Sequence, residues 1–133
     1  MCCVVRKSLL IGITFSILAL LISGCLESRA GRRQSNATGE LATRLILQGN
    51  CGSCHTLQTQ DLNLTGQVGP DLTRQGLRGR SSEWLRQQIT DPSSIPDHEV
   101  VPGFEGKQKF MPIMDLASDH ELDALVEFLQ SLN

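Results

Sequence analysis

The sequence is poor in aromatic residues and lacks the residue clusters that most enzymes need. Only 4% of its 133 residues are aromatic, with one tryptophan and no tyrosine. No Ser/His/Asp arrangement, paired carboxylate cluster or glycine-rich phosphate loop occurs, so we predict no independent catalysis. The formal net charge is −2 rather than strongly positive, which argues against nucleic-acid binding.

The sequence also lacks an apolar run long enough to cross a bilayer comfortably. The longest run, residues 9–22, falls short of the ~20 apolar residues that a spanning helix needs. Because Arg6 and Lys7 precede it, we predict a signal peptide over residues 1–24. The run ends in Ile22-Ser23-Gly24-Cys25, which resembles the lipobox of bacterial lipoproteins and implies cleavage before an acylated Cys25. The alternative is an uncleaved anchor helix with an incidental cysteine.

After this segment we expect a tether and one domain. Residues 25–38 begin with the cysteine that would carry lipid and continue as a polar, aperiodic stretch, which predicts a flexible tether. Residues 39–133 form the predicted domain. A domain of this size with few aromatic residues buries a thin core, so a large apolar group is expected to fill its middle.

Three segments of the domain have the apolar periodicity of short helices, and no segment predicts a strand convincingly. The first covers residues 40–48. The second begins at Ser81 or Ser82 and ends before Pro92. The third follows a capping box, Ser118-Asp119-His120-Glu121, after which apolar residues recur at helical spacing: Leu122, Leu125, Val126 and Leu129. We therefore predict an all-α fold.

The chemistry is concentrated in Cys51-Gly52-Ser53-Cys54-His55. This CxxCH pattern is the attachment signature of c-type haem, in which each cysteine sulfur adds across a haem vinyl group. His55 is then the proximal ligand of the iron. Two alternatives are a thioredoxin-like dithiol, which needs a preceding strand, and a zinc site that must recruit His98 or His120. Export and the shortage of further ligands favour haem.

With these residues the chain resembles small class I monohaem cytochromes c, particularly the cytochrome c domain of bacterial cytochrome c oxidase subunit II. The resemblance covers residues 39–132 and depends on four landmarks in order: CxxCH at 51–55, Gly69-Pro70-Asp71-Leu72, Trp84-Leu85 before Asp91-Pro92, and Met111-Pro112 before the final helix. It implies a small cytochrome c fold, with three or four short helices around one covalent haem c.

The resemblance also implies roles for single residues. Pro70 matches the proline whose carbonyl accepts a hydrogen bond from the proximal histidine, and Met111 matches the distal iron ligand. Arg78 falls where related domains place an arginine near a haem propionate, although Arg80 or Arg74 can serve instead.

Other residues have weaker assignments. Met114 is interpreted as packing, and His98 is a rival distal ligand. Trp84 is either a wall of the haem pocket or simple core. The chain departs from the family at Leu45, where an aromatic residue is common, and at residues 100–110, which are longer than the usual loop before the methionine.

These predictions describe an electron carrier and not an enzyme. A haem with His and Met ligands has no open position for substrate, so the iron exchanges only electrons. We expect a lipid-anchored carrier facing the periplasm or cell exterior, which transfers electrons to or from a membrane-bound terminal oxidase, reductase or quinol-oxidising complex. The alternatives are a fixed haem subunit of a quinol-oxidising complex, and a haem enzyme or gas sensor with a labile distal methionine.

Overall fold

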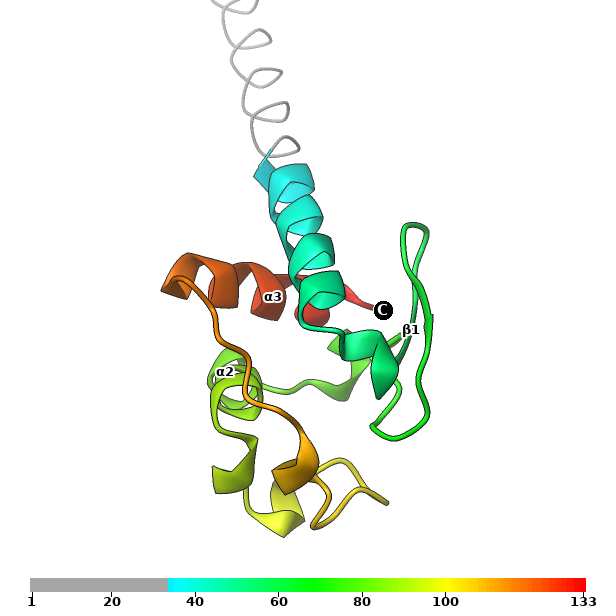
Figure 1. Cartoon of the computed structure of the whole chain (residues 1–133), viewed down its shortest axis with the longest axis vertical. Helices are drawn as coiled ribbons and strands as arrows, with labels where there is room; N and C mark the ends of the chain where they lie inside the picture. The colour runs from blue at the N-terminus through cyan, green and yellow to red at the C-terminus, as the bar shows by residue number, and fades with distance from the viewer. Residues whose placement is uncertain (1–33) are drawn as a thin grey trace, which may run out of the picture. The chain divides into compact units, whose positions relative to one another are not determined.

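Three short α-helices carry the fold in the computed structural model, which describes residues 34–133 (Figure 1). They cover residues 34–48, Ser82–Thr90 (α2) and Asp119–Ser131 (α3). The residues Thr38–Asn133 form one compact unit. The predicted signal peptide and Cys25 lie outside the described residues. Among residues 34–133, no helix has the length and apolar character needed to cross a membrane. The predicted all-α class is confirmed.

The first helix begins earlier than predicted. It ends at residue 48 as expected, but residues 34–39 are also helical, although the sequence analysis placed residues 34–38 in a flexible tether. These residues are polar and lack apolar periodicity, so the pattern gave no sign of them. Adding a turn to an existing helix costs far less than nucleating one, which explains the extension.

A short hairpin follows the CxxCH segment, so the prediction of no strand is wrong in this detail. Strands β1 (Thr56–Gln58) and β2 (Asn63–Thr65) pair antiparallel, with Leu57 opposite Leu64. Thr59 Oγ1 closes the turn by accepting from the backbone N–H of Leu62 at 3.0 Å. Strands of three residues are too short to show alternation, which is why the sequence did not reveal them.

The second helix has the predicted cap and the predicted end. Ser81 Oγ accepts from the Trp84 N–H at 3.1 Å, and Leu85 and Ile89 are buried. Pro92 opens a 3-10 turn, η3 (Pro92–Ser94), just beyond the helix.

The chain between α2 and α3 is irregular, as predicted. It contains the further 3-10 turns η4 (Asp97–Glu99) and η5 (Gln108–Phe110). Gln108 is buried, and its Nε2 donates to the Ile95 carbonyl at 3.1 Å and to Asp97 Oδ1 at 2.7 Å. This one side chain therefore ties the two turns together.

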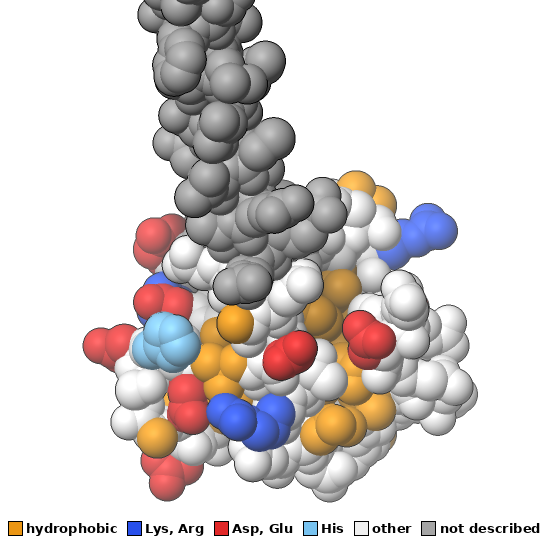
Figure 2. All heavy atoms as spheres, turned by 90° about the horizontal axis from the view of Figure 1, so that it is seen from above, with side chains coloured by type: hydrophobic (Ala, Val, Ile, Leu, Met, Phe, Trp, Pro, Cys, Tyr) orange, Lys and Arg blue, Asp and Glu red, His pale blue; other side chains and the backbone are white. Residues whose placement is uncertain are grey.

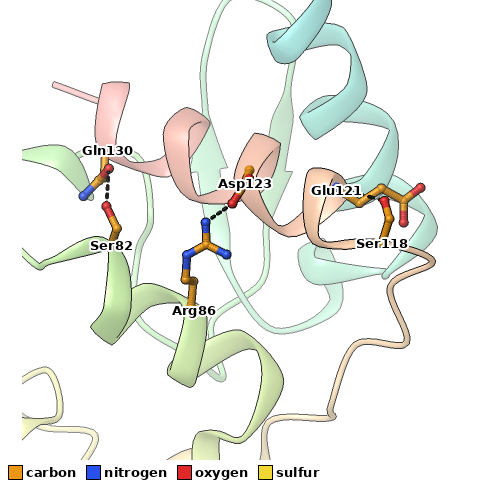
Figure 3. Close-up of polar contacts among 6 residues, drawn as sticks. All are labelled: Ser82, Arg86, Ser118, Glu121, Asp123 and Gln130. Carbon is orange, nitrogen blue, oxygen red and sulfur yellow. Dashed lines mark hydrogen bonds and ion pairs between the residues drawn. The ribbon is translucent and has the colours of Figure 1, made fainter.

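The cap of α3 differs slightly from a standard capping box. Ser118 Oγ accepts from the Glu121 N–H, as predicted (Figure 3). The Glu121 carboxylate, however, accepts from the Ala117 N–H at 2.8 Å. The contact from Glu121 satisfies the Ala117 N–H, and Ser118 Oγ adds a second acceptor for the Glu121 N–H, which also donates to the Ser118 carbonyl at 3.1 Å.

The core joins both ends of the compact unit. Helix 34–48, the hairpin, α2 and α3 contribute apolar side chains to one cluster: Ala42, Leu45, Ile46, Leu57, Leu62, Leu85, Ile89, Leu122, Leu125, Val126, Leu129 and Leu132. The four predicted apolar residues of α3 are all in it.

Polar contacts hold α2 against α3 at the edge of this core. Arg86 pairs with Asp123, and Ser82 Oγ donates to Gln130 Oε1 at 3.3 Å (Figure 3). A further contact ties the end of the chain to the short turn η2 (Gly76–Arg78), where the Gly76 N–H donates to the Leu132 carbonyl at 2.7 Å. A β-carbon on Gly76 would collide with that carbonyl and with the carbonyl of Gln130.

Candidate functional site

The CxxCH segment is presented by a sharp turn at the end of the first helix. Asn50 has a left-handed backbone conformation, with φ 53°, which asparagine adopts more readily than most residues. The chain then enters a 3-10 turn, η1 (Cys51–Ser53). The His55 N–H donates to the Cys51 carbonyl at 2.9 Å. A helix and a turn, not a strand, therefore precede the cysteine pair, unlike the arrangement of a thioredoxin-like dithiol.

Both cysteines are half-buried and form no disulfide with each other. Cys51 packs against the core cluster. Burial raises the pKa of the Cys51 thiol above its usual value, and the neighbouring Cys54 raises it further, although a backbone hydrogen bond opposes the shift. Before any haem is attached, Cys51 is therefore a neutral thiol at physiological pH. The pair supplies two sulfurs directly before an imidazole.

The imidazole of His55 is fixed by the Pro70 carbonyl. Nδ1 lies 2.7 Å from this oxygen. Because a carbonyl oxygen only accepts, Nδ1 must carry the proton, which leaves the lone pair on Nε2 to bind a metal. Gly69 lies directly against the ring, since a β-carbon at this position would be 2.5 Å from Cε1 and 3.0 Å from Nε2. The backbone of residues 69–70 thus sets both the position and the tautomer of His55.

Gly66 allows a second close approach behind the motif. Its β-carbon would lie 2.5 Å from the Cys54 carbonyl carbon and 2.6 Å from the Gly52 oxygen and the His55 nitrogen. The Gly66 carbonyl accepts from Thr56 Oγ1 at 2.7 Å. The sequence analysis did not single out Gly66, because an isolated glycine gives no sign of what its backbone touches.

The two methionines of the distal loop have different surroundings. Met114 packs against the core, and its Cε would lie 2.7 Å from a β-carbon on Gly49. Met111 is half-buried outside that cluster, and its Sδ lies 3.6 Å from Gln88 Nε2. This matches the interpretation of Met114 as packing and leaves the Met111 thioether as the candidate ligand. Gln88 is not among the residues predicted from the sequence, although its position one turn after Trp84 was a possible signal.

Trp84 and two neighbouring arginines, Arg78 and Arg80, differ in their contacts. Trp84 packs against the core, and its buried Nε1 has no hydrogen-bond partner in the described structure. The Arg80 guanidinium lies 4.6 Å from the centre of the Trp84 ring. Arg78, by contrast, donates to the Asp71 carbonyl at 2.8 Å and to Gln75 Oε1 at 3.0 Å. Of Arg78 and Arg80, Arg80 is therefore the one that lies over the Trp84 ring.

The two other histidines are exposed and contact none of the candidate haem residues in the described interactions. The His98 side chain is 80% exposed and lies 3.7 Å from the Glu99 carboxylate. His120 is exposed in the first turn of α3. Among residues 34–133, no group of three or more His, Cys, Asp or Glu side chains is placed to hold a metal ion.

These residues fit a haem. Two thiols, a histidine with a free Nε2 and a thioether are the donors that a covalent haem requires. Apolar side chains flank both candidate ligands and reach the surface, with Val68 beside Gly69, and with Phe110 and Ile113 on either side of Met111. Figure 2 shows apolar side chains exposed among charges of both signs on one face. The orphaned Trp84 Nε1 suits an acceptor such as a propionate.

Comparison with known proteins agrees with this fit. The family model described as cytochrome c matches residues 40–133, which is most of the chain and almost all of the described part. Searches of curated proteins and of solved structures returned no significant match.

Proposed function

Because the chain belongs to the cytochrome c family, we propose that it is a lipid-anchored electron carrier between respiratory-chain components on the outer side of a bacterial membrane. Membership of the family confirms the predictions of a c-type cytochrome, of covalently bound haem c and of a role in electron transfer. The site residues, the anchor and the partner are the parts of this proposal that go further.

The His55–Pro70 contact carries the assignment of the site. It fixes the imidazole, with Nε2 free, directly after two thiols in CxxCH spacing. We assign Cys51 and Cys54 as the attachment points, and His55 and Met111 as the axial ligands. When bound, the haem supplies a one-electron change at its iron.

The surrounding residues then prepare the ligands. The Pro70 carbonyl accepts a hydrogen bond from the Nδ1–H group of His55. This bond increases the donor strength of Nε2 and prevents the ring from turning. A thioether ligand from Met111 favours the reduced state and so a high potential. The unpartnered Trp84 Nε1 and the adjacent Arg80 guanidinium support the proposal that these two residues would hold a propionate. Arg78 can assist only if it gives up a present contact.

The anchor and the acceptor follow from the sequence. Cys25 at the end of the lipobox-like segment is the proposed lipidation site. A membrane-bound terminal oxidase is the proposed acceptor, in keeping with the resemblance to the cytochrome c domain of oxidase subunit II. A lipid near the start of the domain keeps the domain close to the membrane. A membrane-bound partner then meets the anchored domain at an effective concentration of about the mM scale.

Membrane vesicles that contain a terminal oxidase test this proposal. We expect Cys25→Ser to slow oxidation of the cytochrome at low protein concentration without changing its visible spectrum. Excess variant should restore the rate, because the domain itself is intact. Cys3→Ser is the matched control and should behave as wild type, since it lies in the segment predicted to be removed. Equal rates for the Cys25 variant and wild type would contradict the anchored-carrier proposal.

A further inference from the structure

Gln88 lies against the sulfur of the proposed distal ligand. Its Nε2 is 3.6 Å from Met111 Sδ, and both side chains are half-buried. A thioether sulfur accepts hydrogen bonds and cannot donate them. The amide nitrogen must therefore face the sulfur, because the amide oxygen would find no donor there.

The core of the domain sets the direction of Gln88. Leu85 and Ile89 are buried one turn apart and fix the rotation of α2. Trp84 and Gln88, also one turn apart, form the adjacent stripe of the same helix. This stripe presents two N–H donors. The Trp84 indole has no hydrogen-bond partner among residues 34–133, and the Gln88 amide donates to Met111.

The loop offers Met111 little other polar support. Its backbone N–H donates to the Gln108 carbonyl at 3.0 Å. For its side chain, the contact from Gln88 is the polar interaction found among the described residues. The neighbours Phe110 and Ile113 are 79% and 67% exposed, so they do not bury the thioether.

We propose that Gln88 is a positioning residue for the distal ligand, which holds the Met111 thioether by a hydrogen bond from its side-chain amide and thereby raises the reduction potential. The inference depends on the proposed role of Met111. A thioether sulfur has two lone pairs, so it can donate one to a metal and accept a hydrogen bond at the other. The hydrogen bond draws electron density from the sulfur, which weakens its donation to the oxidised iron more than to the reduced iron.

Gln88→Leu removes the donor, and Gln88→Glu removes it with almost no change in shape. We expect both variants to have a lower reduction potential and a shifted far-red sulfur–iron band. Added imidazole should displace Met111 from the oxidised protein about two- to fivefold less readily, because the sulfur donates more strongly to the oxidised iron without the hydrogen bond, and this is the size expected for one weak hydrogen bond. The potential should fall further in Gln88→Glu, because a carboxylate beside the site stabilises the oxidised state.

The neighbouring residue provides a matched control. Gln87 lies in the same helix, but it is exposed and its Nε2 donates to Ser94 Oγ at 2.7 Å. Gln87→Leu should leave the potential, the far-red band and the imidazole affinity as in wild type, although it removes the same chemical group from the same helix.

The outcomes separate this inference from the proposed function. If the Gln88 variants match Gln87→Leu in the far-red band and in imidazole affinity, while Met111→Ala abolishes the band, the inference is overturned and the ligand assignment stands. If wild type has no such band, or Met111→Ala keeps it, the ligand assignment itself fails and takes the inference with it. Should Gln88→Leu fail to fold, the isosteric Gln88→Glu gives the same readouts.

Discussion

In residues 51–72, the proximal segment, backbone hydrogen bonds join residues far apart in sequence, whereas the backbone bonds of residues 92–118, the distal segment, are local and side chains link its turns. In the proximal segment, the Cys54 carbonyl accepts from the N–H groups of Val68 and Gly69 at 2.9 and 2.8 Å. In the distal segment, Gln108 and Asp97 link the turns, and a single amide reaches Met111. Backbone contacts survive most substitutions and side-chain contacts do not. The comparison indicates that His55 is held more firmly than Met111, so of the two proposed ligands Met111 is the one expected to be lost first.

The largest expected effect is on the proximal side. Gly66→Ala places a β-carbon within 2.5–2.6 Å of backbone atoms of the CxxCH segment, which cannot move aside as a side chain could. We expect a loss of about 3 kcal/mol or more in unfolding free energy and little accumulated haem protein. Thermal unfolding and haem staining of denatured gels measure both effects.

Gly39→Ala is the matched control for that change. Gly39 lies in the first helix, with nothing within 4 Å of a β-carbon. Alanine there should be neutral or stabilise the protein by up to about 1 kcal/mol, since it favours helix more than glycine does. If Gly66→Ala were as well tolerated as Gly39→Ala, the proximal segment would not be rigid.

The second-largest expected effect comes from replacing the two methionines of the distal segment. Met111→Ala should lower the reduction potential, abolish the far-red band and admit carbon monoxide, with little loss of stability. Met114→Ala should keep the spectrum but lose about 1–2 kcal/mol of stability, because its side chain packs against the core and is only partly buried. A carbon monoxide difference spectrum and thermal unfolding distinguish the two variants. The opposite pattern would reverse the assignment of ligand and packing residue.

The smallest expected effect is on the stability of the distal segment at acid pH. Hydrogen bonds from the Gln108 side chain and the Gly106 N–H lower the pKa of Asp97 below its usual value. Because the folded-state pKa lies below the unfolded one, this stabilisation is complete above the unfolded value and is lost as pH falls through the folded pKa. Below about pH 4, the distal segment should therefore loosen and the far-red band fade.

Asp97→Ala removes the contacts of this carboxylate with Gln108 and Gly106 at every pH. The pH at which half of the far-red band is lost, the acid midpoint of the band, should therefore rise by a few tenths of a unit. Asp71 provides the proximal control, because the Thr73 side chain and N–H lower its pKa in a similar way. Asp71→Ala should leave the acid midpoint of the band unchanged. Equal shifts in the two variants would show that the acid transition is global and does not begin at the distal segment.

Features with a local physical cause could be predicted from the sequence. The Ser81 cap, the end of α2 before Pro92 and the buried stripe of α3 follow from capping and periodicity. The His55–Pro70 contact was implied by the resemblance and is seen in the structure, although the haem ligation itself stays a prediction.

Features that depend on contacts distant in sequence could not be predicted. The hairpin is too short to show a pattern, and its register depends on Leu57 being buried in a core built from other elements. The close approach at Gly66 and the contact between Gln88 and Met111 exist only once the chain has folded. The extra helical residues before position 40 carry no apolar signal at all.

The bond between Gly76 and Leu132 has a consequence for the order in which the protein is made. The chain segments it joins are far apart in sequence, and the core likewise needs side chains from both the first helix and α3. Folding therefore cannot finish until residue 132 has been synthesised, which is after Cys51 and Cys54 have been made. During that interval both thiols are on an open chain and accessible to the machinery that attaches the haem. The late closure of the C-terminal end thus gives cofactor attachment a time window that a domain folding from its N-terminus would not provide.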